Sequence, residues 1–189
     1  MKVHAFFFFM PYNKGVMKET YCTTKSFSHI GRRQECNCGP TAITNAVLTL
    51  QDRDDDPERV YQLVAETGKK RLTYWNFDLF HMFGGTVDFL TKSYLEKVFE
   101  KKGMRDIEVS KREKMTKENV INALERGSIL YIQFRHHPRY GCHHVLAYEG
   151  HPGRHSYFLK LADGWSDKPR YIDVNELGRG YIIEISEKR

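Results

Sequence analysis

One stretch, CNCGPTAITNAV at residues 36–47, constrains the fold of this chain more than any other. Cys38 is followed directly by Gly39 and Pro40, and proline is tolerated in the first turn of a helix because its missing N–H would have no partner there. Apolar residues then recur at helical spacing and form a stripe that can face a core: Ile43, Ala46, Val47 and Leu50. The pattern predicts a buried helix with Cys38 at its N-terminus.

A thiol at the start of a helix lies near the positive end of the helix dipole and close to backbone N–H groups that have no partner. Both features favour the thiolate, which is the form of cysteine that attacks a carbonyl carbon. The same N–H groups can hold an oxyanion. Cysteine is also a common small buried residue without chemistry, so Cys38 has two interpretations on this stretch alone.

Length and composition indicate one globular domain, which we place at residues 34–189. Residues 1–33 are interpreted either as an N-terminal strand and loop, with the four phenylalanines at 6–9 in the strand, or as a removable leader. The net charge of +6 is interspersed along the chain, so nucleic-acid binding is not predicted. Four cysteines are too few for a disulfide scaffold and favour a reduced compartment, so we expect a soluble, cytoplasmic protein with no membrane span.

The pattern of apolar residues predicts helices before strands. Helices are expected near 38–50, 57–68, 86–102 and 116–126. Strands are expected at 107–109, 129–134, 144–148, 157–162, 170–172 and 181–185, with a helical turn at 173–177. The aromatic segment 69–85 is either a binding wall or packing under a loop. This order predicts an α+β fold whose opening helix packs on a mostly antiparallel sheet.

Side chains that can take part in catalysis flank two of the later strands. His143 and His144 stand at the start of the 144–148 strand, and Asp163 follows the end of the 157–162 strand. A hairpin brings the start of one strand and the end of the next to the same end of a sheet. A carboxylate there can orient an imidazole, and the imidazole can face the thiol of Cys38. This is the arrangement of nucleophile, base and orienting group used in acyl transfer.

At this point the residues resemble a family. Cys-Gly-Pro-Thr-Ala at 38–42, a histidine leading a strand toward Gly150, and Asp-Gly-Trp at 163–165 resemble papain-like cysteine peptidases. The nearest resemblance is to the peptidases that trim double-glycine leaders of bacteriocins, and to their free-standing relatives. The order Cys, His, Asp matches that family, and the segment 124–130 resembles its helix-to-strand step before the histidine. The resemblance covers residues 34–185.

The resemblance implies a papain-like fold and a thiol-dependent hydrolase, a peptidase or amidase that works through a thioester and needs no cofactor. It implies that Cys38 is the nucleophile and Asp163 the orienting residue. For the general base we choose His144 over His143, because its distance to Gly150 suits the family pattern. An acyl transferase would use the same triad on a peptide, amide or thioester substrate.

Two further roles follow from the same resemblance. Trp165 is expected to border the substrate and to shield the contact between histidine and aspartate from water. The family carries a glutamine about two helical turns before the cysteine as an oxyanion donor, and Gln34 is the nearest candidate here. Gln34 lies closer to Cys38 than the family pattern has it, so backbone N–H groups are the alternative donors.

Two rival classes of function use the same residues. A zinc site could draw on thiolates and imidazoles from Cys36, Cys38, Cys142, His143 and His144, although their spacing is not that of common structural zinc motifs. A non-catalytic binding module could keep the fold and its proline, glycine and aromatic residues for packing alone. The relative positions of the Cys38 sulfur, the two imidazoles and the Asp163 carboxylate distinguish these classes.

Overall fold

A computed structural model describes the protein over four ranges of the chain: 36–51, 55–75, 85–166 and 168–188. The predicted N-terminal strand or leader in residues 1–33, including Cys22, lies outside these ranges, and so does the candidate oxyanion donor Gln34. The short strands β1 (Tyr74–Trp75) and β2 (Gly85–Thr86) mark the two ends of the aromatic segment, whose centre is likewise outside them.

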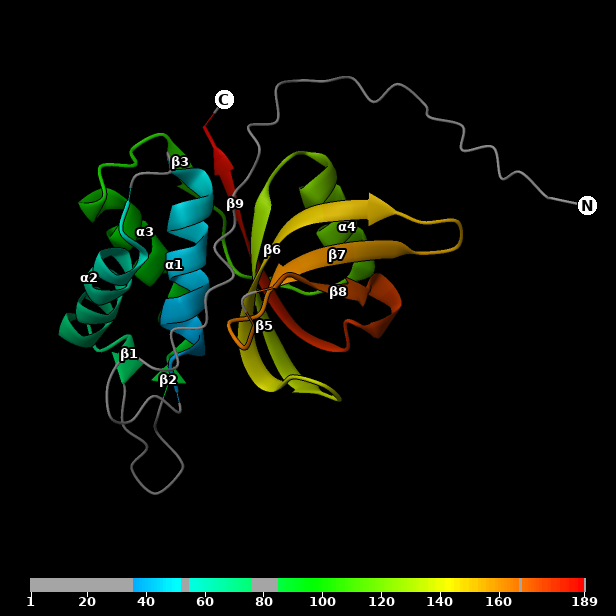
Figure 1. Cartoon of the computed structure of the whole chain (residues 1–189), viewed down its shortest axis with the longest axis horizontal. Helices are drawn as coiled ribbons and strands as arrows, with labels where there is room; N and C mark the ends of the chain where they lie inside the picture. The colour runs from blue at the N-terminus through cyan, green and yellow to red at the C-terminus, as the bar shows by residue number, and fades with distance from the viewer. Residues whose placement is uncertain (1–35, 52–54, 76–84, 167, 189) are drawn as a thin grey trace, which may run out of the picture.

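The described residues form an α+β fold built around an antiparallel sheet of seven strands (Figure 1). The strands run in the spatial order β3-β9-β5-β6-β7-β8, and β4 pairs with β9 beside β3. Their bounds are Ile107–Val109 (β3), Glu113–Lys114 (β4), Ile129–His137 (β5), Gly141–Pro152 (β6), Tyr157–Ala162 (β7), Arg170–Asp173 (β8) and Arg179–Glu187 (β9). The long strands β5, β6 and β9 therefore occupy the middle of the sheet, where both edges of each are paired.

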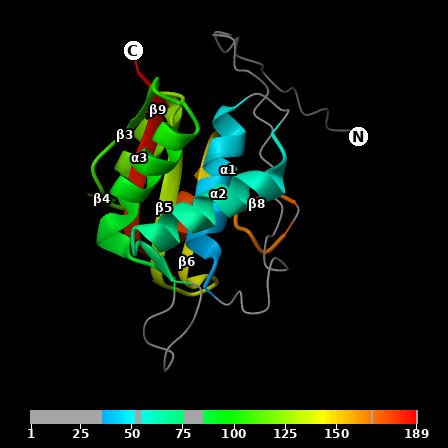
Figure 2. The same cartoon turned by 90° about the vertical axis from the view of Figure 1, so that its left-hand side faces the viewer.

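Helices cover both faces of this sheet. The α-helices are Cys38–Leu50 (α1), Pro57–Lys70 (α2), Thr91–Lys101 (α3) and Lys117–Glu125 (α4), with 3-10 turns at Asp88–Leu90 (η1) and Val174–Glu176 (η2). The helix α1 lies against β6, and α2 crosses its outer side (Figures 1 and 2). The helix α4 packs against β5 and β6 from the opposite face. None of the helices in the described ranges has the length and apolar character needed to cross a membrane.

Side-chain alternation along the strands divides the core into two layers. Tyr131 and Leu146 belong to the cluster shared with α1, whereas Ile132 and Val145 belong to the cluster shared with α4. Because successive residues of a strand point to opposite faces, neighbouring residues of β6 serve different layers. This rule decides where His143 and His144 point.

The predicted α+β class, the opening helix at Cys38 and the antiparallel sheet are confirmed. The bounds of several elements differ from those predicted, most at the third helix and at β6. The helix expected from residue 86 begins at Thr91, because Thr86 pairs with Tyr74 and Asp88–Leu90 form the turn η1. The strand expected at 144–148 runs over Gly141–Pro152, since pairing with β5 and with β7 extends it at both ends.

Gly68 in α2 is held at its position by close packing. A Cβ at this residue would lie 2.5 Å from the Tyr94 hydroxyl and 2.6 Å from the Tyr74 Cβ. We therefore expect Gly68→Ala to lower the free energy of unfolding by about 1–3 kcal/mol, although alanine is the better helix former by about 1 kcal/mol. Urea unfolding measures the change. The exposed control Lys69→Ala should stay within about 0.5 kcal/mol, and a stabilised Gly68→Ala protein would contradict the packing argument.

Candidate active site

Cys38 is the first residue of α1, as predicted, and it is partly buried. The helix begins there because Asn37 accepts the first main-chain hydrogen bond, from the N–H of Thr41 at 3.0 Å. Gly39 admits the neighbouring strand, since a Cβ at this position would clash with the side chain of Thr86 in β2. The thiol is thus carried at the end of a buried helix whose first N–H groups have no partner within the helix.

The thiol of Cys38 is protonated at neutral pH in this arrangement. Burial raises its pKa to about 11, and this effect outweighs the backbone N–H groups of His144 and Gly39, which lower it. The helix start was expected to favour the thiolate, and desolvation reverses that expectation. A resting protein of this kind holds a neutral thiol, so attack on a carbonyl requires a base to take the proton.

His144 points to the face of the sheet that carries α1. Its Nδ1 contacts the hydroxyl of Tyr131, and its Nε2 lies 3.7 Å from a carboxylate oxygen of Asp88 in η1. Burial lowers the pKa of His144 to about 4, although the negative charge of Asp88 acts in the opposite direction. The neutral ring keeps its proton on Nε2, toward the carboxylate, so its Nδ1 lone pair accepts from the Tyr131 hydroxyl.

His143 points to the opposite face. Its Nε2 lies 2.7 Å from the main-chain oxygen of Asp163. A carbonyl oxygen can only accept, so Nε2 carries the proton and the lone pair of the neutral ring is on Nδ1. The imidazole stacks on the indole of Trp165 with 4.3 Å between ring centroids, and Tyr140 stacks with it at 5.9 Å. Burial also lowers the pKa of His143, which keeps the ring neutral.

The Asp-Gly-Trp turn that binds this imidazole also packs against α1. One carboxylate oxygen of the buried Asp163 accepts the N–H of Trp165 at 3.0 Å, and the other lies 3.6 Å from Nε of Arg170. Gly164 has φ +73°, which favours glycine, and a Cβ there would lie 2.9 Å from Thr41 Cγ2. The turn therefore packs against the first turn of the helix that begins at Cys38.

The structure pairs the predicted residues differently from the sequence analysis. The expected contact between the Asp163 carboxylate and the imidazole of His144 is not formed in the described part of the chain: Asp163 contacts His143, through its main-chain oxygen. The reason is that side chains alternate between the two faces along a strand. Leu146 and Ala162 pair on the α1 face, so the next residue, Asp163, lies on the opposite face with His143. Trp165 accordingly covers His143, while more than half of its own surface stays exposed.

Two residues of this region were missed from the sequence. Tyr131 contacts Nδ1 of the His144 ring, and a carboxylate oxygen of Asp88 lies 3.7 Å from its Nε2. Burial raises the pKa of Tyr131, and the charge of Cys38 raises it further. Alternation along the predicted strand at 129–134 would have put Tyr131 on the helix-covered face. Asp88 gives no comparable signal, because it lies in a turn that was interpreted as helix.

The residues of the alternative zinc site do not form one. In the part of the chain that the structure describes, no group of three His, Cys, Asp or Glu side chains is placed to hold a metal ion. The three described cysteines, Cys36, Cys38 and Cys142, form no disulfide bond. His143 and His144 diverge to opposite faces of the sheet, so they cannot act together as ligands of one ion with Cys38.

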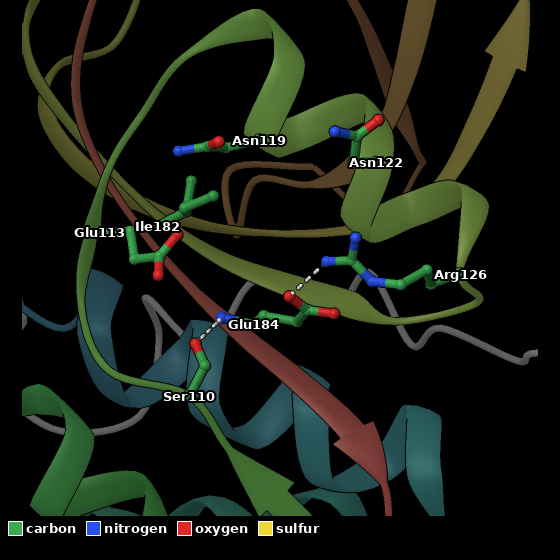
Figure 3. Close-up of a pocket in the computed structure, with 7 residues that line it drawn as sticks. All are labelled: Ser110, Glu113, Asn119, Asn122, Arg126, Ile182 and Glu184. Atoms are coloured by element: carbon green, nitrogen blue, oxygen red, sulfur yellow. Dashed lines mark hydrogen bonds and ion pairs between the residues drawn. The ribbon is translucent and has the colours of Figure 1, made fainter.

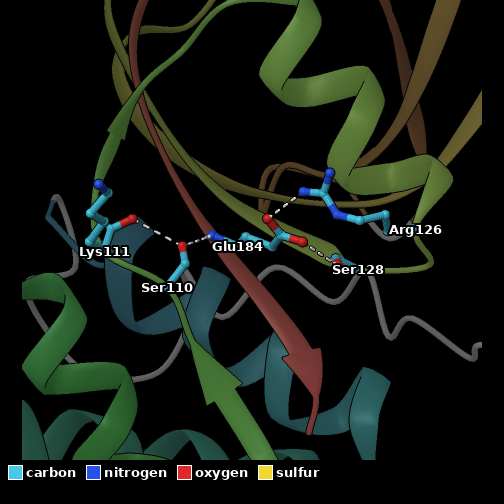
Figure 4. Close-up of polar contacts among 5 residues, drawn as sticks. All are labelled: Ser110, Lys111, Arg126, Ser128 and Glu184. Carbon is cyan, nitrogen blue, oxygen red and sulfur yellow. Dashed lines mark hydrogen bonds and ion pairs between the residues drawn. The ribbon is translucent and has the colours of Figure 1, made fainter. Parts of the chain in front are cut away.

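A small polar cavity lies apart from this site, on the sheet face covered by α4. Its volume is about 80 Å³, and its lining comes from α4, β9 and the β3–β4 region (Figure 3): Ser110, Glu113, Asn119, Asn122, Arg126, Ile182 and Glu184. Glu184 accepts from Arg126 at 2.8 Å and from Ser128 at 2.6 Å, and its N–H donates to Ser110 (Figure 4). Contacts within the wall thus hold Glu184, Arg126 and Ser110, which indicates a structural role for the cavity.

Comparisons of the chain with protein-family models, with curated proteins and with solved structures find no match. The case for a function therefore depends on the geometry around Cys38 and on the resemblance of the sequence motifs.

Proposed function

We propose that this protein is a thiol-dependent hydrolase that cleaves a peptide or amide bond through a thioester at Cys38, with His144 as the general base. One observation carries the proposal. The Cys38 thiol lies against the main-chain N–H of His144, so it adjoins the peptide that joins the two histidines. Of the two imidazoles, that of His144 points to the sheet face that carries α1, with its Nε2 toward Asp88. The resemblance to papain-like peptidases supports the same class of reaction.

The reaction follows from these protonation states. The imidazole of His144 takes the proton of the Cys38 thiol while the sulfur attacks the carbonyl carbon. The N–H groups at the start of α1 stabilise the oxyanion, because they have no partner in the helix. The imidazolium returns its proton to the leaving amine as the carbon–nitrogen bond breaks, which leaves a thioester. Water, deprotonated by the same imidazole, then hydrolyses the thioester and releases the acid and the thiol.

Asp88 has a positioning role in this scheme. Its carboxylate lies 3.7 Å from Nε2 of His144, so it keeps the proton of the neutral ring on Nε2 and stabilises the imidazolium that forms. The Asp163 unit holds the neighbouring His143 through its main-chain oxygen, and its carboxylate fixes the turn by accepting the N–H of Trp165. The indole of Trp165 covers one side of the His143 ring.

Acetylation by p-nitrophenyl acetate tests the nucleophile without knowledge of the natural substrate. We expect the ester to acetylate Cys38 as a thioester, and Cys38→Ser to abolish the modification, because Cys38 is the thiol beside the base. Intact-protein and peptide mass spectrometry locate the acetyl group, and hydroxylamine releases it. Cys36→Ser is the matched control, two residues away on the same segment and also a cysteine outside any disulfide bond.

Two results would overturn the proposal. One is acetylation spread over Cys36, Cys38 and the exposed Cys142 in proportion to their accessibility. The other is equal loss of acetylation in Cys36→Ser and Cys38→Ser proteins that retain the wild-type melting temperature. Either result would favour a non-catalytic module in which Cys38 only packs.

A further inference from the structure

Two arginines stack on one tyrosine on the sheet face that carries α1. The guanidinium carbon of Arg112 lies 3.6 Å from the ring centroid of Tyr181, and that of Arg135 lies 5.0 Å from it. We call these three residues the arginine–tyrosine row. Stacking on an aromatic ring holds a guanidinium flat and leaves its N–H edge free to bind an anion.

The register of the sheet connects this row to the candidate active site. Tyr181 of β9 pairs with Gln133 of β5, and Gln133 pairs on its other side with His144 of β6. Neighbouring strands lie about 4.8 Å apart, so the backbones of Tyr181 and His144 are about 10 Å from each other. The three residues share one face, the face on which the thiol of Cys38 meets the N–H of His144.

The row carries an excess of positive charge. Arg135 binds Asp88 at 2.8 Å, and Asp88 lies 3.7 Å from the imidazole of His144. Among the described residues, Arg112 has no carboxylate partner, and its buried Nε makes no hydrogen bond. Its charge reaches the site, because it is one of the groups that lower the pKa of His144. Two guanidinium groups and one carboxylate leave one uncompensated positive charge beside the thiol-bearing end of α1.

We propose that the arginine–tyrosine row is a specificity subsite that binds the carboxylate of an acidic side chain in a peptide substrate. An extended peptide advances about 3.3 Å per residue, so about 10 Å corresponds to an acidic residue about three positions from the bond that is cleaved. Carboxylate is the chemistry that fits, because a planar guanidinium binds it through two parallel hydrogen bonds. This inference rests on the proposed hydrolase, and it adds the substrate class.

Protection of Cys38 by peptides tests the subsite, whichever way the substrate chain runs through the site. The probes are alanine-based heptapeptides, acetylated and amidated at their ends, with a single Glu, Gln or Lys moved through the interior positions. Each competes with p-nitrophenyl acetate for Cys38 in the full-length protein. We expect the best Glu peptide to protect at a concentration about fivefold or more below that of its Gln counterpart, with Lys weakest.

Substitutions assign that preference to Arg112. Arg112→Gln should reduce the ratio between Glu and Gln peptides to about one, and Arg112→Glu should reverse the preference toward Lys peptides. Arg139→Gln is the matched control, because Arg139 also stacks on a tyrosine, with 5.5 Å to the Tyr140 ring, and is exposed. The control should keep the preference for Glu. Thermal melting of each variant verifies that it is folded.

The outcomes separate the two proposals. Absence of selective acetylation at Cys38 in the wild-type protein would overturn the hydrolase itself. Selective acetylation together with equal protection by Glu, Gln and Lys peptides, or with protection by none, would overturn the subsite alone. The subsite alone would also be overturned if Arg112→Gln and Arg139→Gln lower the preference for Glu equally. The arginine–tyrosine row would then serve only to pack β9 against β5.

Discussion

Replacing His144 with glutamine is expected to slow acetylation of Cys38 by p-nitrophenyl acetate about 10²- to 10⁴-fold, the range that a positioned general base supplies. Replacing His143 with alanine is expected to cost less than tenfold. The two substitutions differ because the two rings lie on opposite faces of the sheet. The ring of His144 lies on the face that carries α1, beside Tyr131 and Asp88, whereas the ring of His143 is fixed on the Asp163 carbonyl on the other face.

The glutamine variant is chosen to preserve the surroundings of residue 144. Its amide oxygen can accept from Tyr131 and its NH₂ can donate to Asp88, and its main-chain N–H still faces Cys38. A loss of activity in His144→Gln would therefore report the missing base rather than a collapsed pocket. The acetylation rate at Cys38, normalised to the folded fraction, is the measurement.

The pH profile provides a second, independent readout of the base. Burial lowers the pKa of His144 to about 4, so its neutral form predominates above that value. The acetylation rate should rise with pH near pH 4 and then level, and this acid limb should be absent in His144→Gln. If His143→Ala is instead the slower variant and loses the acid limb, His143 is the base.

Much of the fold could be predicted because local signals and tertiary packing agree. The proline of the first turn, the apolar stripe behind it and the capping Thr116, which accepts the N–H of Asn119 at 3.2 Å, all act within one helix. The alternating strands could be identified from their own residue patterns, with knowledge of no more than one neighbouring strand. The exceptions, the start of α3 and the ends of β6, are decided by pairing partners far away in the chain.

The site could be predicted only in part. A sequence motif shows neither which face of a strand a residue occupies nor how deeply its side chain is buried. Cys38 lies where its Gly-Pro sequence predicts. The choice between His143 and His144 depends on which face each occupies, and a strand alternates faces at every residue. The protonation of the thiol depends on how much protein surrounds it, and burial there exceeds the effect of the helix start.

The folding stability of the protein is expected to fall by about 3 kcal/mol between pH 6.5 and pH 4 because of His144 alone. Burial lowers the pKa of this imidazole to about 4 in the folded state, against 6.5 for an exposed histidine. Between these values the unfolded chain binds a proton that the folded chain does not. The stabilisation is therefore complete above pH 6.5 and is lost as the pH falls toward 4.

The charged groups around His144 determine the size of this effect. Asp88, 3.7 Å away, favours the imidazolium and limits the fall, whereas Arg112 and His143 disfavour it. Urea unfolding at pH 7 and pH 4, in the wild-type protein and in His144→Gln, isolates the contribution, because the acidic residues titrate in both proteins. The wild type should lose about 3 kcal/mol more than the variant over this interval. Parallel losses would mean that the ring of His144 is hydrated, and burial would then not be what lowers its pKa.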